Sequence, residues 1–156
     1  MGIQIIPLLE KWYPQTIEMI QRTIQVSQKN IYPPGLIEKF CHKYDLEKFK
    51  VKVQEIEYFI AIDSSLQKVI GIIGLKENEL RTFFVDPEYQ GKGVGRLLYN
   101  MLEQLARERQ IKKLFLYGGS IGEPAYLKFG FKKIKKVEKE TEGIHYTDTY
   151  MEKELE

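Results

Sequence analysis

The sequence predicts one mixed α+β domain spanning residues 1–156, and three observations support this fold class. Apolar residues recur at helical spacing in two segments of the N-terminal third, whereas three later segments are rich in β-branched and aromatic residues. A glycine-rich turn then joins the last of these apolar strands to an amphipathic helix. The 156 residues suffice for one hydrophobic core without disulfides or metals, and they leave little room for a second domain.

The first half of the chain is expected to form a strand, two helices and three antiparallel strands. Pro14 stands where the first turn of a helix tolerates proline, and the apolar residues after it recur at helical spacing. A second apolar stripe follows the break at residues 30–34, and residues 46–49 fit one further helical turn. The expected ranges are 3–8 for the first strand, 14–28 and 36–44 for the two helices, and 57–63, 69–75 and 80–85 for the three strands.

The second half begins with the glycine-rich turn. Apolar residues recur at helical spacing from Val94 to Ala106, so a helix is expected to begin at the glycines. A strand at 114–117, a short helix containing Tyr126, and strands near 131–137 and 144–151 complete the expected order. Phe131, Ile134 and Val137 are spaced by three, a period that does not suit a strand.

Composition excludes several classes of protein. Hydrophobic residues make up 43% and charged residues 29% of the chain, as in soluble globular proteins. No apolar run approaches the ~20 residues that span a membrane, and the N-terminus lacks the cationic lead of a signal peptide, so we expect a cytoplasmic protein without a membrane partner. The net charge of +2 does not indicate nucleic-acid binding. Cys41, His42 and His145 do not form a set of metal ligands, so no metal is expected.

The glycine-rich turn is suited to binding a phosphate. The glycines at 91, 93 and 95 lack a Cβ, so the backbone can approach a ligand closely. The unpaired N–H groups of the following helix point over the turn and favour an anion there, as does the helix dipole. The spacing fits neither the nucleotide P-loop, which needs Lys and Ser or Thr after its last glycine, nor the dinucleotide pattern G-x-G-x-x-G.

The turn resembles, residue by residue, the acetyl-CoA loop of the GNAT superfamily of N-acetyltransferases, whose pattern is Q/R-x-x-G-x-G/A. Gln90, Gly93 and Gly95 match this pattern. Downstream, residues 125–131 are similar to the family's F-Y-x-K-x-G-F segment and place Tyr126 four residues before Gly130. An ordinary strand-to-helix turn would account for the glycines but not for this second segment. The order of expected elements is also that of the GNAT fold.

The resemblance implies a twisted, mostly antiparallel central sheet that is flanked by helices and splayed between its fourth and fifth strands. It also implies that acetyl-CoA is the co-substrate. Its pyrophosphate would lie on backbone N–H groups of the turn, and its pantetheine arm would pair with backbone groups at the end of the preceding strand. The residues expected to bind acetyl-CoA are Phe84, Val85, Gln90, Gly91, Lys92, Gly93, Val94, Gly95 and Arg96.

The resemblance further implies that a primary amine attacks the thioester directly. Tyr126 is the expected catalytic residue, because a phenol with a pKa of about 10 can protonate a thiolate whose conjugate acid has a pKa of about 8.5. Many members carry Asn or Ser seven residues before this tyrosine and Ala three residues after that position, where this chain has Gly119 and Gly122. These departures remove side-chain contacts that the family pattern provides.

No general base is assigned from the sequence. Glu57, Asp63 and Glu79 lie near strand ends, where carboxylates are commonly solvated, and water can relay the proton. Two other functions stay open: a CoA-binding regulatory module of the same fold without turnover, and a non-enzymatic interaction domain without affinity for CoA.

The acceptor amine is not specified by any motif. A protein lysine, an N-terminal amine, a polyamine, an aminoglycoside and a small metabolite all stay open. Trp12, Tyr13, Tyr32 and Tyr44 are candidates for lining the acceptor pocket and equally for the core or the surface. A homodimer formed through an edge strand is also open.

Overall fold

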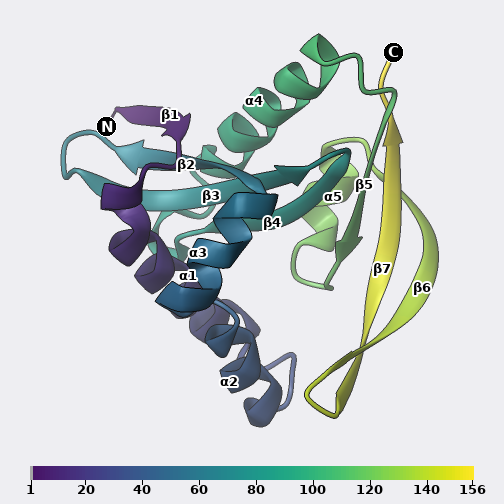
Figure 1. Ribbon diagram of the computed structural model, residues 1–156. Coiled ribbons are helices and arrows are strands. Elements are labelled where there is room, and N and C mark those ends of the chain that lie inside the picture. The colour runs from purple at the N-terminus through teal and green to yellow at the C-terminus, as the bar shows by residue number, and fades with distance from the viewer. Residues whose placement is uncertain (1) are drawn as a thin grey trace.

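Seven strands form one sheet in the computed structural model, which describes residues 2–156. Their order across the sheet is β1-β2-β3-β4-β5-β7-β6 (Figure 1). All neighbouring strands are antiparallel except β4 and β5, which are parallel. The mostly antiparallel α+β fold expected from the sequence is confirmed. The strands are β1 (Ile3–Pro7), β2 (Glu57–Asp63), β3 (Lys68–Lys76), β4 (Glu79–Val85), β5 (Lys113–Gly118), β6 (Lys132–Thr141) and β7 (Ile144–Glu154).

The expected splay lies between β4 and β5. These two strands pair in register at Glu79 and Phe115, where the Phe115 N–H donates to the Asn78 carbonyl at 3.2 Å. The Asn78 side chain strengthens this junction by donating to the Lys113 carbonyl at 3.0 Å. Beyond it the strands diverge, so β1 to β4 and the set β5, β7 and β6 form the two halves of the sheet in Figure 1.

Three helices precede the sheet strands β2 to β4, so the prediction of two helices is wrong. Residues 46–55 form a full helix because Asp45 caps its first turn, accepting the Lys48 N–H at 2.9 Å, and because Phe49 is completely buried. None of the helices among residues 2–156 is long and apolar enough to cross a membrane. The helices are α1 (Tyr13–Gln28), α2 (Pro34–His42), α3 (Leu46–Glu55), α4 (Val94–Glu108) and α5 (Glu123–Lys128).

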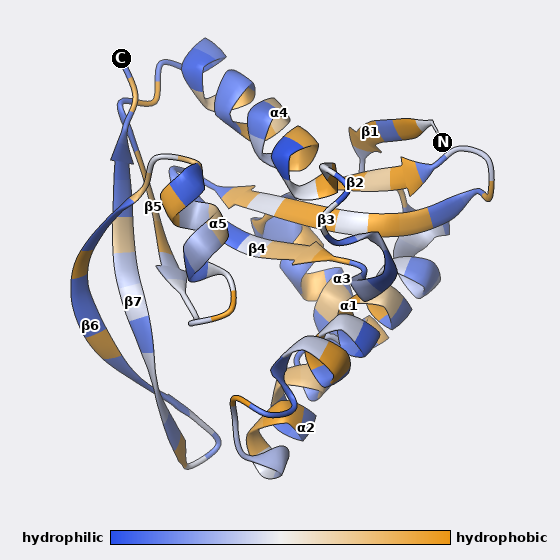
Figure 2. Ribbon diagram, turned by 180° about the vertical axis from the view of Figure 1, so that it is seen from behind, coloured by the Kyte–Doolittle hydropathy of each residue, from blue (hydrophilic) through white to orange (hydrophobic). Residues whose placement is uncertain are grey.

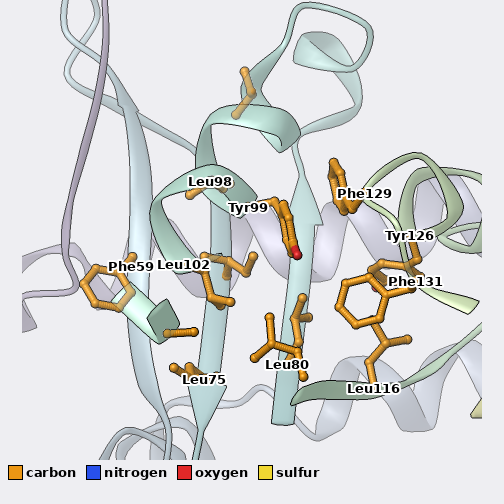
Figure 3. Packing of buried hydrophobic residues seen from close by; sticks show 14 of the residues in the cluster. Phe59, Leu75, Leu80, Leu98, Tyr99, Leu102, Leu116, Tyr126, Phe129 and Phe131 are labelled. Carbon is orange, nitrogen blue, oxygen red and sulfur yellow. The ribbon is translucent and has the colours of Figure 1, made fainter. Parts of the chain in front are cut away.

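The sheet is covered on both faces. Helix α4 packs on one face, and α1 and α3 pack on the other, so β2 and β3 are buried on both sides and are apolar almost throughout (Figure 2). Figure 3 shows Leu98, Tyr99 and Leu102 of α4 pointing onto the sheet. Tyr99 also stacks on Phe129 with the ring centroids 4.3 Å apart, which joins α4 to the segment after α5.

Strand β6 contains an irregularity that explains its spacing of apolar residues by three. The register with β7 shifts between Lys133 and Lys135, so Ile134 is an extra residue and is 52% exposed. The strand expected there is confirmed, although the alternation of side chains is broken. At the far end of the hairpin, the ring of Tyr146 lies 5.2 Å from the ring of Phe40, so the hairpin reaches α2.

Candidate functional site

A cleft of about 540 Å³ opens where β4 and β5 diverge. This volume lies within the roughly 300–1,000 Å³ range of small-molecule sites. The cleft is lined by the end of β4, the glycine-rich turn, the start of α4, and α5 with the loop before it. Tyr126 and every residue expected to bind acetyl-CoA except Lys92 line this one cleft.

The glycine-rich turn presents bare backbone to the cleft. Gly91 and Gly93 have φ angles of +78° and +87°, and a Cβ at either would meet no atom within 4 Å. These positions therefore require glycine for their backbone conformation rather than for lack of space. The first hydrogen bond of α4 runs from the Leu97 N–H to the Gly93 carbonyl at 3.1 Å, and no side chain caps the helix.

The first amides of α4 are consequently available to a ligand. Within residues 2–156, the N–H groups of Val94, Gly95 and Arg96 have no hydrogen-bond partner on the chain. Gly95 has a packing role as well, since a Cβ there would lie 3.0 Å from Cζ of Phe83. The helix can therefore begin close to β4, with its N-terminal amides at the edge of the cleft.

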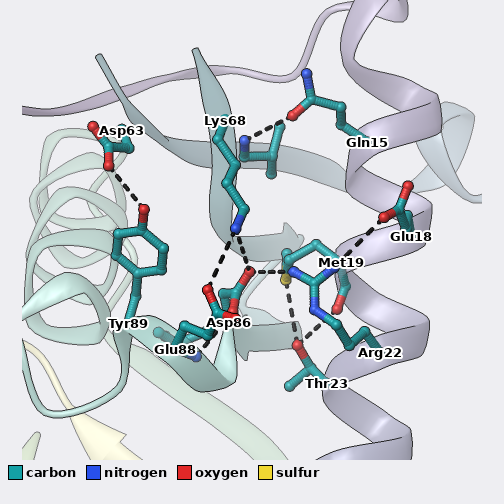
Figure 4. A network of polar contacts seen from close by, with 12 residues as sticks. Gln15, Glu18, Met19, Arg22, Thr23, Asp63, Lys68, Asp86, Glu88 and Tyr89 are labelled. Atoms are coloured by element: carbon teal, nitrogen blue, oxygen red, sulfur yellow. Dashed lines mark hydrogen bonds and ion pairs between the residues drawn. The ribbon is translucent and has the colours of Figure 1, made fainter. Parts of the chain in front are cut away.

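Buried polar contacts hold the turn in place (Figure 4). The carboxylate of Asp86, which is 0% exposed, contacts the guanidinium group of Arg22 on α1 and accepts the Glu88 N–H at 2.9 Å. The Tyr89 hydroxyl donates to the Asp63 carboxylate on β2 at 2.8 Å. Hydrogen bonds from the Ser65 and Tyr89 hydroxyls hold the pKa of Asp63 below its usual value. The turn is thus fixed to α1 and β2 through Arg22 and Asp63, two residues that do not line the cleft.

The substitution Asp86→Asn is expected to lower the free energy of unfolding by about 2 kcal/mol, because hydrogen bonds to a charged group contribute roughly 1.5–3 kcal/mol. Urea unfolding followed by circular dichroism measures this loss. Glu88→Gln is the control. The exposed Glu88 side chain forms a surface ion pair with Lys68 at 3.7 Å, and loss of such a pair should cost well under 1 kcal/mol. Equal effects of the two substitutions would contradict the anchoring role of Asp86.

The peptide groups at the end of β4 face two directions. The Asp86 N–H donates to the Ile70 carbonyl of β3 at 2.9 Å. Because hydrogen-bonded pairs alternate along antiparallel strands, Phe84 also faces β3, whereas Phe83 and Val85 direct their peptide groups toward the cleft. The backbone of Phe84 is expected from the sequence to pair with the pantetheine arm. In the structure the Phe84 carbonyl instead lies beside Gly71 of β3.

The three remaining polar residues of the turn occupy different places. The Gln90 side-chain amide donates to the Val85 carbonyl at 3.0 Å and so crosses the end of β4. The Arg96 guanidinium lies 4.7 Å from the centre of the Phe129 ring and lines the cleft. Lys92 lies over the Tyr89 ring at 5.3 Å and does not line the cleft.

Tyr126 on α5 is 9% exposed and reaches the cleft beside Phe83, whose ring centroid is 5.9 Å away. Within residues 2–156 its hydroxyl forms no hydrogen bond, so it is available to a bound molecule. Burial raises its pKa above the ordinary value, and the charges of Asp148 and Tyr44 raise it further. The phenol therefore stays protonated at neutral pH.

The glycines that depart from the family pattern lie where tyrosine side chains pass close to the backbone. A Cβ at Gly122 would lie 2.8 Å from Cε2 of Tyr126, and one at Gly118 would lie 3.0 Å from the same atom. A Cβ at Gly119 would lie 2.7 Å from the hydroxyl oxygen of Tyr32. In place of side-chain contacts to a ligand, these glycines provide room for Tyr126 and Tyr32 at the cleft.

The substitution Gly122→Ala is expected to lower kcat about tenfold, because the added Cβ would displace the ring of Tyr126, the residue expected from the sequence to be catalytic, by a fraction of an ångström. It should also cost about 1 kcal/mol of stability through overpacking. Thiol release and thermal unfolding measure the two effects. Gly35→Ala is the control, since its Cβ would make an ordinary 3.5 Å contact with Ile144. An unchanged kcat for Gly122→Ala would show that the Tyr126 ring is not held by this glycine.

A second cavity of about 250 Å³ adjoins the cleft and shares six lining residues with it: Gln28, Tyr32, Tyr44, Arg81, Phe84 and Gly119. Two of the four aromatic residues considered for the acceptor pocket therefore line both cavities. Of the other two, Trp12 belongs to the hydrophobic cluster between the helices and the sheet, and Tyr13 packs against that cluster. The polar residues of this cavity that sequence reasoning missed are Gln28, Lys43, Arg81 and Asp148.

The carboxylates considered as bases lie elsewhere. Glu57 pairs with Arg109 at 2.7 Å, Asp63 binds Tyr89, and neither lines a cavity. Glu79 lies 3.7 Å from Arg81, outside both cavities. No group of three or more potential metal ligands occurs in the described part of the chain.

Comparisons with known proteins agree on one family. A family model described as "Acetyltransferase (GNAT) domain" matches residues 23–155. The chain is 24% identical over 139 residues to "Uncharacterized N-acetyltransferase YafP" of Escherichia coli K12, covering 89% of this chain and 87% of that protein. Among solved structures, the PaiA N-acetyltransferase of Thermoplasma acidophilum, determined in complex with coenzyme A, is 28% identical with a TM-score of 0.82 and covers 99% of this chain and 100% of that one. A GCN5-related N-acetyltransferase of Rhodopseudomonas palustris has a TM-score of 0.91 at 22% identity, covering 99% of this chain and 97% of that chain, and so shares the fold.

Proposed function

Because the chain belongs to the GNAT acetyltransferase family, we propose that it transfers the acetyl group of acetyl-CoA to a primary amine by direct attack of the amine on the thioester. One observation carries the proposal: unpaired backbone N–H groups at the start of α4 and the protonated hydroxyl of Tyr126 line the same cleft. These are the groups that a diphosphate and a departing thiolate require.

The phosphate end of the site consists of main-chain donors. The N–H groups of Val94, Gly95 and Arg96 would donate to the pyrophosphate oxygens, and the helix dipole would favour the negative charge. The open space over Gly91 and Gly93 lets the phosphates approach this backbone. Arg96 adds a positive charge at the wall of the cleft, and Lys92 adds one outside it.

The pantetheine arm would extend along the free edge of β4. Its amides need hydrogen-bond partners once they leave water. The peptide groups of Phe83 and the N–H of Val85 face the cleft in the manner of a strand that lacks a neighbour, whereas the Val85 carbonyl already accepts from Gln90. The splay between β4 and β5 leaves this edge open. The thioester at the end of the arm would then lie near Tyr126, which lines the same cleft.

The transfer requires one bond to form and one to break. The neutral amine nitrogen bonds to the thioester carbonyl carbon, and the bond from that carbon to sulfur breaks. Tyr126 donates its proton to the leaving sulfur, which gives free CoA thiol, and the proton that the attacking nitrogen loses restores the phenol through water. The net products are an N-acetylated amine and CoA.

Two measurements test the proposed function. Calorimetry with acetyl-CoA reports binding, and a thiol-reactive dye reports CoA release in the presence of a mixture of amines, with mass spectrometry to confirm N-acetylation. We expect both binding and amine-dependent thiol release. Binding without thiol release would instead indicate a regulatory module, and the absence of binding would indicate an interaction domain.

A further inference from the structure

The second cavity contains charges that the transfer of an acetyl group does not itself require. Strand β4 carries a bulge: Gly74 faces Thr82 and Leu75 faces Leu80, so Arg81 has no opposite residue on β3. A bulge re-aims the side chain of its extra residue, and Arg81 lines both the cleft and the second cavity. Its nearest carboxylate is Glu79, with the two groups 3.7 Å apart and both partly exposed.

Two further charged residues line the second cavity, and they come from different elements of the fold. Lys43, at the end of α2, donates to the Thr141 hydroxyl at 3.2 Å, and Asp148 lies on β7. Within residues 2–156 these two side chains form no ion pair with each other, although both line a cavity of about 250 Å³. Burial lowers the pKa of Lys43 and raises that of Asp148, so each lacks a fully compensating partner.

A buried hydrogen-bonding atom lies between the two cavities. Oε1 of Gln28 is buried and has no hydrogen-bond partner within residues 2–156, and the residue lines both cavities. A buried polar atom without a partner is costly unless a bound molecule satisfies it. Oε1 of Gln28 and the Asp148 carboxylate both accept hydrogen bonds, as binding of an amine requires, whereas Lys43 and Arg81 only donate.

We propose that the acceptor is a small amine that also carries an anionic group, with the amine held by Asp148 and Gln28 and the anion held by Lys43 and Arg81. This assignment rests on the proposed acetyl transfer and specifies its substrate class. The cavity offers one carboxylate to the amine and two cations to the anionic group. A polyamine would place additional positive charge beside two cations and only one carboxylate, which electrostatic complementarity opposes.

The test compares matched amines that differ by one carboxylate: phenylalanine with phenethylamine, and tyrosine with tyramine, together with spermidine. Thiol release with the full chain gives kcat/KM for each. We expect the carboxylate-bearing member of each pair to exceed its partner by at least about tenfold, equivalent to about 1.4 kcal/mol. The substitutions Arg81→Met and Lys43→Met should remove this preference by lowering the value for the amino acid alone.

Lys50→Met is the control, because it removes an equal charge from an exposed site on α3 that lines neither cavity. A higher kcat/KM for the amines without a carboxylate, or for spermidine, would overturn this assignment while leaving acetyl transfer intact. Calorimetric titration of the same amines into the CoA complex gives a second readout that does not depend on turnover. Absence of thiol release with every amine, despite binding of acetyl-CoA, would reject the proposed function itself.

Discussion

Replacing Tyr126 with phenylalanine is expected to lower kcat by at least about a hundredfold, because general acid catalysis by a positioned side chain contributes roughly 10²–10⁴ in rate. The substitution removes one hydroxyl and keeps the ring that packs against Phe83 and Gly122. Affinity for acetyl-CoA should not change, since the phosphates would bind at the other end of the cleft. The raised pKa of Tyr126 keeps its proton available throughout the neutral range.

Steady-state thiol release gives kcat for this variant, and calorimetry gives the dissociation constant of acetyl-CoA. Tyr150→Phe serves as the matched control, because its hydroxyl donates to Glu152 at 2.8 Å on β7 and the residue lines neither cavity. Both variants should unfold at nearly the same temperature as the parent protein. A kcat for Tyr126→Phe within a factor of three of the parent value would remove Tyr126 from the mechanism.

The parts of this protein that the sequence predicts well are those encoded by local signals. The turn at residues 91–95 is recognisable because glycine tolerates positive φ and because a regular apolar stripe follows it. Helix α3 lacks such a stripe: lysines alternate with Phe49, Val51 and Val53, and Val51 is exposed. Its cap at Asp45 was the signal that could have extended the predicted turn to a helix.

The acceptor-side charges could not be predicted from local patterns. Lys43, Arg81 and Asp148 come from α2, β4 and β7, and only the order of the strands and the reach of the β6–β7 hairpin bring them to one cavity. Arg81 gave a faint signal, since it interrupts an apolar strand. The direction of the Arg81 side chain depends on the bulge in β4, which arises from the pairing of β4 with β3. The register of that pairing depends on both strands, so it cannot be predicted from the β4 segment alone.

The substitution Gly93→Val is expected to weaken acetyl-CoA binding by about a hundredfold, which corresponds to roughly 2.7 kcal/mol. A Cβ at this position would meet no atom within 4 Å, so steric exclusion by the rest of the protein is not the cause. The φ angle of +87° is strained for a β-branched residue. Relief of that strain would rotate the first peptide groups of α4 away from the direction in which they would donate to the phosphates.

Gly143→Val separates this effect from a general loss of stability. Gly143 has a φ angle of +86°, and a Cβ there also meets nothing within 4 Å, but it lies in the turn between β6 and β7. Both substitutions should lower the free energy of unfolding by about 1–3 kcal/mol. Only Gly93→Val should reduce acetyl-CoA affinity in calorimetry, because Gly93 directly precedes the first amides of α4 and Gly143 is remote from them in the sequence. Similar affinities for the two variants would mean that the phosphates do not bind at this helix terminus.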